Sequence, residues 1–215
     1  MKGIKLEEVV AADTNWVKSD LRGASFNESF LYNSIFSSSC LTDADFSCAQ
    51  LNNASLDYVV AKNTCFQGAQ FSKAQLSFGD FYGSTFAWGR LDKACLLAAN
   101  LRKVNFEKAE LTNACLRHAD LRQANLKDAR LHGADLTGAQ LNKKWLPFVT
   151  VAEANLNVTL LGPNHVTLNT GGMYPLDYWI KNSGSIFNFK KDPKALKDFK
   201  SILKMFKEKV AHHND

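Results

Sequence analysis

Carboxylates that could carry acid–base chemistry recur in this sequence at multiples of twenty residues. The positions are Asp20, Asp80 and Asp120, with an amide, Asn100, on the same spacing. Two carboxylates held side by side can serve as a general acid and a general base. The sequence places no nucleophile–base pair, glycine-rich phosphate loop or cluster of metal ligands beside them. We therefore expect no catalytic residue, no cofactor and no small-molecule substrate, and a protein that is not an enzyme.

Thiols and imidazoles are the other reactive groups. The five cysteines never form a CxxC pair, and their odd number indicates neither a zinc ribbon nor a disulfide framework. Cys95 and Cys115 stand twenty residues apart and could be bridged, but in a reducing compartment we expect free thiols. His165, His212 and His213 lack the spacing of metal ligands. We expect no metal site.

The composition is that of an ordinary soluble chain. It has 215 residues, 46% of them hydrophobic, which is enough to bury a substantial core. No stretch approaches the roughly 18–20 apolar residues of a membrane span, and the start, MKGIKLEEVV, lacks the apolar region of a secretory signal peptide. Most of the net charge of +5 lies in residues 190–215, which hold 8 basic and 4 acidic groups, whereas residues 1–189 hold 18 and 17. The body is nearly neutral and the tail is basic.

A period of five identifies the elements that position these groups. Of the 25 positions at every fifth residue from Leu21 to Leu141, 24 are Leu or Phe, and Ala61 is the exception. The residue two places before each of them is small almost throughout. A step of five fits neither the helical period nor the strand period. The backbone must therefore reset within each five, as a short extended triplet with two inward side chains followed by a two-residue turn.

A chain that turns a corner after every triplet, always to the same side, closes into a coil and stacks as a solenoid. The number of sides follows from phenylalanines at a spacing of twenty: Phe26, Phe46, Phe66, Phe86 and Phe106. This spacing predicts four fives in each coil and one column of stacked rings. Ala61 fits this arrangement, because its coil also holds Phe66 and Phe71, and a small side chain at position 61 compensates for the volume of the two rings in the core.

The fives read ADLRQ, ANLKD, ADLTG and AELTN, a pattern that resembles the pentapeptide-repeat family, whose repeat is written A(D/N)LXX. The resemblance implies an all-β solenoid, a right-handed quadrilateral β-helix, which we assign to residues 16–156. It also implies that the Asp and Asn residues at multiples of twenty hydrogen-bond nearby backbone at the corners, so we expect scaffold residues there. Residues 1–15 are expected to form a cap or a first irregular coil, although Ile4, Leu6, Val9 and Ala11 hold the same register and the solenoid could begin there.

A non-repeat, partly helical C-terminal cap or segment is expected over residues 157–215. The repeat pattern stops at Pro147 and recovers briefly at residues 152–156. Residues 193–210 predict an amphipathic helix with an apolar face of Leu196, Phe199, Leu203, Phe206 and Val210 and a lysine-rich opposite face. That helix could cap the open end of the solenoid, or it could bind an anionic membrane surface or a partner.

Two outward patches are candidate protein-contact sites. The first is a basic column: Arg22, Lys62, Arg102 and Arg122, joined by Lys103 and Lys143. It could contact an acidic partner. The second is an apolar strip in which Tyr58 stacks on Phe78, with Leu97 nearby and His118 further along. Either patch could instead be covered by the C-terminal segment.

Solenoids present extended walls to other macromolecules, so we expect a non-catalytic scaffold that binds another protein. Members of the resembling family include effectors that bacterial pathogens deliver into host cells, and one group adds a HECT-like ubiquitin-ligase domain, for which residues 157–215 are too short. The resemblance thus implies a bacterial cytoplasmic protein, or one secreted into a host cell without a signal peptide, whose partner is a host protein or a topoisomerase.

The alternative function is protection of DNA gyrase by DNA mimicry, the activity of the quinolone-resistance members of the family. Mimicry of a polyanion needs a strongly negative surface. Residues 16–146 hold 15 basic and 12 acidic groups, which argues against it unless the charges are segregated. Direct binding of nucleic acid through the lysine-rich tail is a weaker alternative, since no cluster of base-stacking aromatic residues accompanies that tail.

Overall fold

The chain forms two compact units, Met1–Asn142 and Lys143–Asp215, and each is treated by itself. The computed structural model describes residues 1–131, 133–140, 148–151, 156–161, 165–168, 173–175 and 204.

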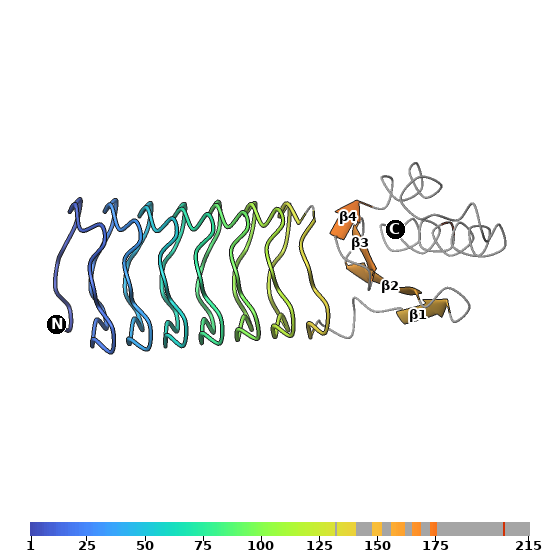
Figure 1. Cartoon of the computed structure of the whole chain (residues 1–215), viewed down its shortest axis with the longest axis horizontal. Helices are drawn as coiled ribbons and strands as arrows, with labels where there is room; N and C mark the ends of the chain where they lie inside the picture. The colour runs from blue at the N-terminus through green and yellow to red at the C-terminus, as the bar shows by residue number, and fades with distance from the viewer. Residues whose placement is uncertain are drawn as a thin grey trace. The chain divides into compact units, whose positions relative to one another are not determined.

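The first unit is a solenoid whose coils lie side by side from the N-terminus onward (Figure 1). Every fifth residue from Lys5 to Asp120 forms a parallel bridge with the residue twenty places later. The bridges fall into four columns, which begin at Lys5, Val10, Asn15 and Asp20. A coil therefore contains twenty residues and four sides, and the spacing read from the phenylalanines is confirmed.

Each side ends in a two-residue turn closed by a backbone hydrogen bond, as from Ala24 N–H to the Leu21 carbonyl at 3.0 Å. The second turn residue adopts a left-handed backbone at every described corner. Six of these residues are glycines, but 22 are not, and their φ angles lie between 51° and 65°. Since this region is disfavoured for residues with a Cβ, the stacking of successive coils must hold these corners in place.

The core is a row of inward side chains between the four walls. The column of phenylalanines from Phe26 to Phe106 is buried, with successive ring centroids 4.7–5.4 Å apart and interplanar angles of 12–30°. Ala61 is also buried. It belongs to a neighbouring column, in which Phe81 stands twenty residues after it. The predicted column of rings is thus confirmed, and the small side chain of Ala61 leaves room for a neighbouring ring.

Residues 1–15 are expected to form a cap or an irregular first coil, or to begin the solenoid early, and the structure has regular coil pairing there. Lys5 pairs with Ser25 and Val10 pairs with Phe30, in the register of all later coils. The reason is that Leu6 and Ala11 occupy the same inner positions as the leucines that follow, although both remain half-exposed.

The second unit contains a four-stranded antiparallel sheet in the order β1-β2-β3-β4 (Figure 1). Its strands are β1 (Phe148–Val151), β2 (Leu156–Leu161), β3 (His165–Leu168) and β4 (Met173–Pro175). Val151 pairs with Leu156, Leu161 with His165, and Thr167 with Met173.

This sheet differs from one expectation. The sequence assigns residues up to 156 to the solenoid, whereas the first unit ends at Asn142 and Leu156 begins an antiparallel strand. The match to the five-residue pattern at residues 152–156 is expected to form part of a coil, but Leu156 instead lies in β2. The remaining expectation, a helix over residues 193–210, lies outside the described residues apart from Lys204, which is helical and exposed.

Candidate protein-contact wall

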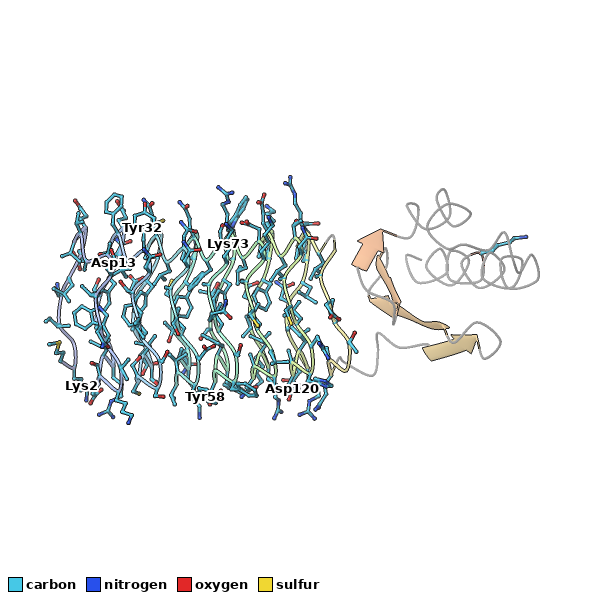
Figure 2. All side chains as sticks on the ribbon, viewed as in Figure 1. Lys2, Asp13, Tyr32, Tyr58, Lys73 and Asp120 are labelled. Atoms are coloured by element: carbon cyan, nitrogen blue, oxygen red, sulfur yellow. The ribbon has the colours of Figure 1, made fainter. Side chains whose placement is uncertain are left out.

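The two predicted surface patches lie on adjacent corners of one wall of the solenoid. Tyr58 stands in one turn, Lys62 in the next, and Val60 forms the bridge between them. The same order repeats in each coil. Tyr58 and Asp120 lie along one edge of the solenoid in Figure 2, opposite the edge that carries Tyr32.

We call this side of the solenoid the contact wall and divide it into three columns. The aromatic corner includes Tyr58, Phe78, Leu97, Ala98 and His118, and its turns also hold the charged Asp57 and Arg117. The central column comprises the bridge residues Asp20, Cys40, Val60, Asp80, Asn100 and Asp120. The basic corner comprises Lys2, Arg22, Lys62, Tyr82, Arg102, Lys103 and Arg122, with one carboxylate, Asp43.

The aromatic corner exposes two stacked rings. The centroids of Tyr58 and Phe78 are 5.0 Å apart, with an interplanar angle of 8°. The two residues are 59% and 47% exposed, and Val60 beside them is 40% exposed. Both aromatic residues have a φ of 59°. A bulky aromatic residue is unusual in this region of backbone space, so the corner keeps large apolar side chains in solvent at a conformational cost.

Ala98 interrupts this column of large side chains. Phe78 stacks on Tyr58 through one ring face, so its other face points toward the next coil, where the corner residue is Ala98. His118 follows one coil later, and its ring occupies the space beside Gly138, where an added Cβ would lie 2.4 Å from Nδ1. His118 therefore leans away from Ala98. The half-buried Leu97 adds apolar surface at this step in the column.

Carboxylates of the central column hold part of the basic corner in ion pairs. Arg22 donates two hydrogen bonds to Asp20, at 2.8 and 2.6 Å, and Arg122 donates two to Asp120 at the same distances. The hydrogen bonds from these arginines hold the pKa values of Asp20 and Asp120 below their usual range. The guanidinium pKa values of Arg22 and Arg122 are raised by the same contacts.

The same carboxylates also bond backbone at the corner. Asp20 accepts from the Arg22 N–H at 3.3 Å, and Asp120 accepts from the Arg122 N–H at 3.1 Å. The prediction that these column residues hydrogen-bond corner backbone is therefore confirmed. Asn100 bridges the column, because its amide donates to Asp80 at 2.7 Å.

Other cations of the basic corner are held more loosely. Lys62 lies 3.2 Å from Asp80. Arg102 Nε lies 4.0 Å from an Asp120 oxygen, and among the described residues it has no hydrogen-bond acceptor. Lys103 lies 5.3 Å from the Tyr82 ring centroid, and its hydrogen bond lowers the pKa of Tyr82. Among Lys62, Arg102, Lys103 and Arg122, the guanidinium of Arg102 and the ammonium of Lys103 therefore have the weakest carboxylate partners.

The structure brings most of the predicted contact residues together. Arg102, Lys103 and Arg122 share the basic corner, and Tyr58, Phe78 and Leu97 share the aromatic corner. Lys143 lies outside the described residues. Sequence reasoning missed Val60 and Tyr82, although their positions, two residues after Tyr58 and twenty after Lys62, were readable once the coil length was known.

Charge on the described solenoid is segregated by corner. Residues 1–140 contain 15 basic and 15 acidic groups. The basic corner and its turn hold six cations and one carboxylate: Lys2, Arg22, Lys62, Arg102, Lys103 and Arg122 against Asp43. The next corner along the chain holds five carboxylates and two cations: Glu7, Glu8, Glu28, Glu107 and Asp128 against Lys108 and Lys127. The basic corner thus differs in charge from the next corner along the chain.

The reactive side chains elsewhere on the described solenoid form no metal cluster. No group of three or more His, Cys, Asp or Glu residues there could hold a metal ion. Cys95 and Cys115 form a bridge pair as free thiols, and burial raises the pKa of the Cys115 thiol. Among the residues that were placed, no helix has the length and apolar character needed to span a membrane.

Parallel bridges in four columns, left-handed corners and a ring-filled core define the first unit as a β-helix of five-residue repeats. The family model for pentapeptide repeats matches eight copies, at residues 4–43, 44–77, 80–117 and 105–142. The chain belongs to the pentapeptide-repeat family, and this membership implies the right-handed winding of the helix.

Solved structures of other proteins share the repeat. HetL, a pentapeptide repeat protein involved in heterocyst differentiation regulation from the cyanobacterium Nostoc sp. strain PCC 7120, is 23% identical, with 67% of this chain and 89% of HetL covered and a TM-score of 0.32. Full-length QnrB1, a plasmid-mediated fluoroquinolone resistance protein, is 19% identical, with 67% and 92% covered and a TM-score of 0.33. No curated protein matches. The assignment to the family rests on the repeats, since these TM-scores are low.

Proposed function

We propose that the solenoid is a non-catalytic scaffold that binds another protein through the contact wall. The observation that carries this proposal is the exposed, stacked pair of Tyr58 and Phe78 in left-handed corners. Strained residues persist where the surrounding structure holds them and often serve a function. Exposed aromatic residues are also the side chains most enriched where proteins bind one another.

Affinity capture from bacterial and host-cell lysates tests this proposal with the full-length protein. The Tyr58→Ser/Phe78→Ser variant is compared with Trp88→Ser, a matched control, because Trp88 is a 58% exposed aromatic residue in a left-handed turn on another corner. We expect the double variant to lose a captured protein that the native protein and the Trp88 variant both retain. Retention by the double variant would contradict the proposal.

Protection of DNA gyrase remains the alternative. Residues 1–140 hold equal numbers of acidic and basic groups, and the basic corner is positive. Both features weigh against a DNA-like surface along the whole solenoid. In a gyrase supercoiling assay with a quinolone, we expect no rescue at excess protein. Rescue would favour the alternative over the contact wall.

The family resemblance suggests an effector role in a host cell. The composition of the lysine-rich segment near residues 193–210 suggests that it binds an anionic membrane. Residues 190–215 carry 8 basic and 4 acidic groups, which would favour anionic vesicles at low salt. Co-sedimentation with vesicles that contain phosphatidylserine, with neutral vesicles as the control, tests the membrane proposal.

A further inference from the structure

One strip of the contact wall, residues 97–103, has cations and apolar groups but no carboxylate. It reads LAANLRK, so Leu97 and Ala98 stand at the aromatic corner, and Arg102 and Lys103 stand at the basic corner. The preceding and following coils carry Asp80 and Asp120 in the central column, where this coil has Asn100. On the assumption that the contact wall binds protein, we propose that residues 97–103 bind an extended acidic peptide that also carries an aromatic side chain.

The apolar end of this strip can receive an aromatic ring. The face of Phe78 that does not stack on Tyr58 points toward Ala98, which has no bulk beyond its Cβ. His118 leans toward Gly138 and away from Ala98. A ring placed over Ala98 would stack on Phe78 and contact Leu97, with an offset or edge contact worth more than the burial of area alone.

The basic end can receive carboxylates. Arg102 Nε is 4.0 Å from its nearest carboxylate oxygen and is buried, so a ligand can reach this guanidinium only through its two terminal NH₂ groups, on a side chain that is 42% exposed. Lys103 is exposed and contacts Tyr82 rather than an acidic group. By contrast, Arg122 on the next coil already forms a bidentate pair with Asp120. A guanidinium and an ammonium without strong partners favour a bound carboxylate.

The distance between the two ends sets the spacing in the ligand. Ala98 and Arg102 are four residues apart along an extended side of the coil, so the ends are about 13 Å apart at the rise of a β-strand. An extended peptide that follows the wall therefore needs its carboxylate about four residues from its aromatic residue. The strip has its two cations, Arg102 and Lys103, at one end and apolar groups at the other, which favours a peptide with a local pair of carboxylates over a continuous phosphate backbone.

A fluorescein-labelled peptide provides the test. The probe is a glycine- and serine-based peptide in which one tryptophan is followed, four residues later, by two glutamates, and its control carries glutamines in their place. Fluorescence anisotropy with the full-length protein should show the glutamine peptide binding at least about tenfold more weakly, as expected for the loss of charge-assisted hydrogen bonds. Equal binding of the two peptides would overturn the proposal.

Protein variants locate the binding. Arg102→Gln/Lys103→Gln should weaken binding of the glutamate peptide by a similar factor, whereas the matched control Arg90→Gln/Lys93→Gln, on the same coil but outside the contact wall, should not. The charge-reversed variant Arg102→Glu/Lys103→Glu should prefer a peptide with lysines in place of glutamates, which a misfolded protein would not do. Loss of binding in the control variant, or no preference for lysine in the charge-reversed variant, would contradict the assignment.

Two further outcomes separate this inference from the proposed function. If single-stranded oligothymidine displaces the glutamate peptide at a lower concentration than unlabelled peptide does, the strip recognises nucleic acid and the peptide proposal is wrong. If no peptide binds while Tyr58→Ser/Phe78→Ser still abolishes capture of a partner, the proposal of an acidic peptide ligand is wrong, but the proposal that the contact wall binds a protein is supported.

Discussion

Hydroxyl groups at the small inner positions of the coil show how individual residues stabilise the stack. Ser34 Oγ donates to the Ala11 carbonyl at 2.9 Å, and Thr64 Oγ1 donates to the Leu41 carbonyl at 2.7 Å, in both cases across to the preceding coil. Ser39 occupies the same kind of position and is buried, yet among the described residues its Oγ has no hydrogen-bond partner. A hydroxyl at this position thus stabilises the coil only where it reaches a carbonyl.

Substitution of these serines should have opposite effects. Ser39→Ala removes a buried hydroxyl without a bond and should raise the free energy of unfolding by about 1 kcal/mol. Ser34→Ala removes the hydrogen bonds with the Ala11 carbonyl and the Thr14 hydroxyl and should lower it by about 1 kcal/mol. Urea unfolding followed by circular dichroism measures both. Destabilisation of equal size in the two variants would show that Ser39 does have a partner.

The pair of Asp120 and Arg122 makes a prediction about pH. The hydrogen bond from Arg122 lowers the pKa of Asp120 in the folded state, so the carboxylate stabilises the fold above its unfolded pKa of about 3.9 and loses that contribution as the pH falls through the folded value. Asp120→Asn should therefore lower the Tm at pH 7. The loss in free energy of unfolding should be less than about 1 kcal/mol, because Arg122 is half-exposed. The difference should shrink toward pH 3.

Asp128→Asn, at an exposed corner, provides the matched control, since asparagine also tolerates the left-handed backbone found there. A difference between native protein and Asp120→Asn that stays constant from pH 7 to pH 3 would contradict the role given to the ion pair.

At the scale of the coil, inner volume is shared between neighbouring positions. Gly79 replaces the usual alanine or serine at a small inner position, and a Cβ there would lie 2.4 Å from Cε2 of Phe81. The Phe81 ring therefore occupies the space that a larger residue 79 would fill. Ala61, twenty residues before Phe81, leaves further room beside this ring. Ala61, the only alanine among the large inner positions from Leu21 to Leu141, thus belongs to a local arrangement with Gly79 and Phe81.

Enlarging Gly79 should be costly only while Phe81 is present. Gly79→Ala should lower the free energy of unfolding by about 1–3 kcal/mol through overpacking, and at least half of that cost should disappear in a Phe81→Leu background. Gly23→Ala is the control, because no atom lies within 4 Å of its added Cβ and only its left-handed φ of 63° is penalised. A double-mutant cycle by urea unfolding measures the coupling, and additive costs at positions 79 and 81 would contradict it.

The elements that the sequence predicts well are those with a repeated inner residue. Leucine and phenylalanine at every fifth position predict the four-sided coil, the turns and the ring column, because a core side chain has one favourable place in each coil. The strands β1 to β4 are not predicted, since residues 148–175 carry no such repeat. A chance match at residues 152–156 instead extends the predicted solenoid too far.

At the scale of the whole molecule, the candidate site depends on how outward columns meet. The sequence predicts the basic column and the apolar strip separately, and it gives no measure of how strongly Asp20 and Asp120 pair with the arginines two residues later. Those pairs depend on side-chain rotamers at the corners, which a residue spacing does not specify. Arg102 and Lys103 are left without a close carboxylate partner, and they lie on the same wall as Tyr58 and Phe78.

Photo-crosslinking at two tyrosines tests most directly whether a partner binds this wall. The photoreactive residue p-benzoylphenylalanine replaces Tyr58 on the contact wall or Tyr32 on the opposite edge (Figure 2) in the full-length protein. Each variant is then irradiated in the lysate from which native protein captures a partner. We predict a crosslink to that partner from position 58 and none from position 32. A crosslink from position 32 alone would contradict the assignment of the contact wall.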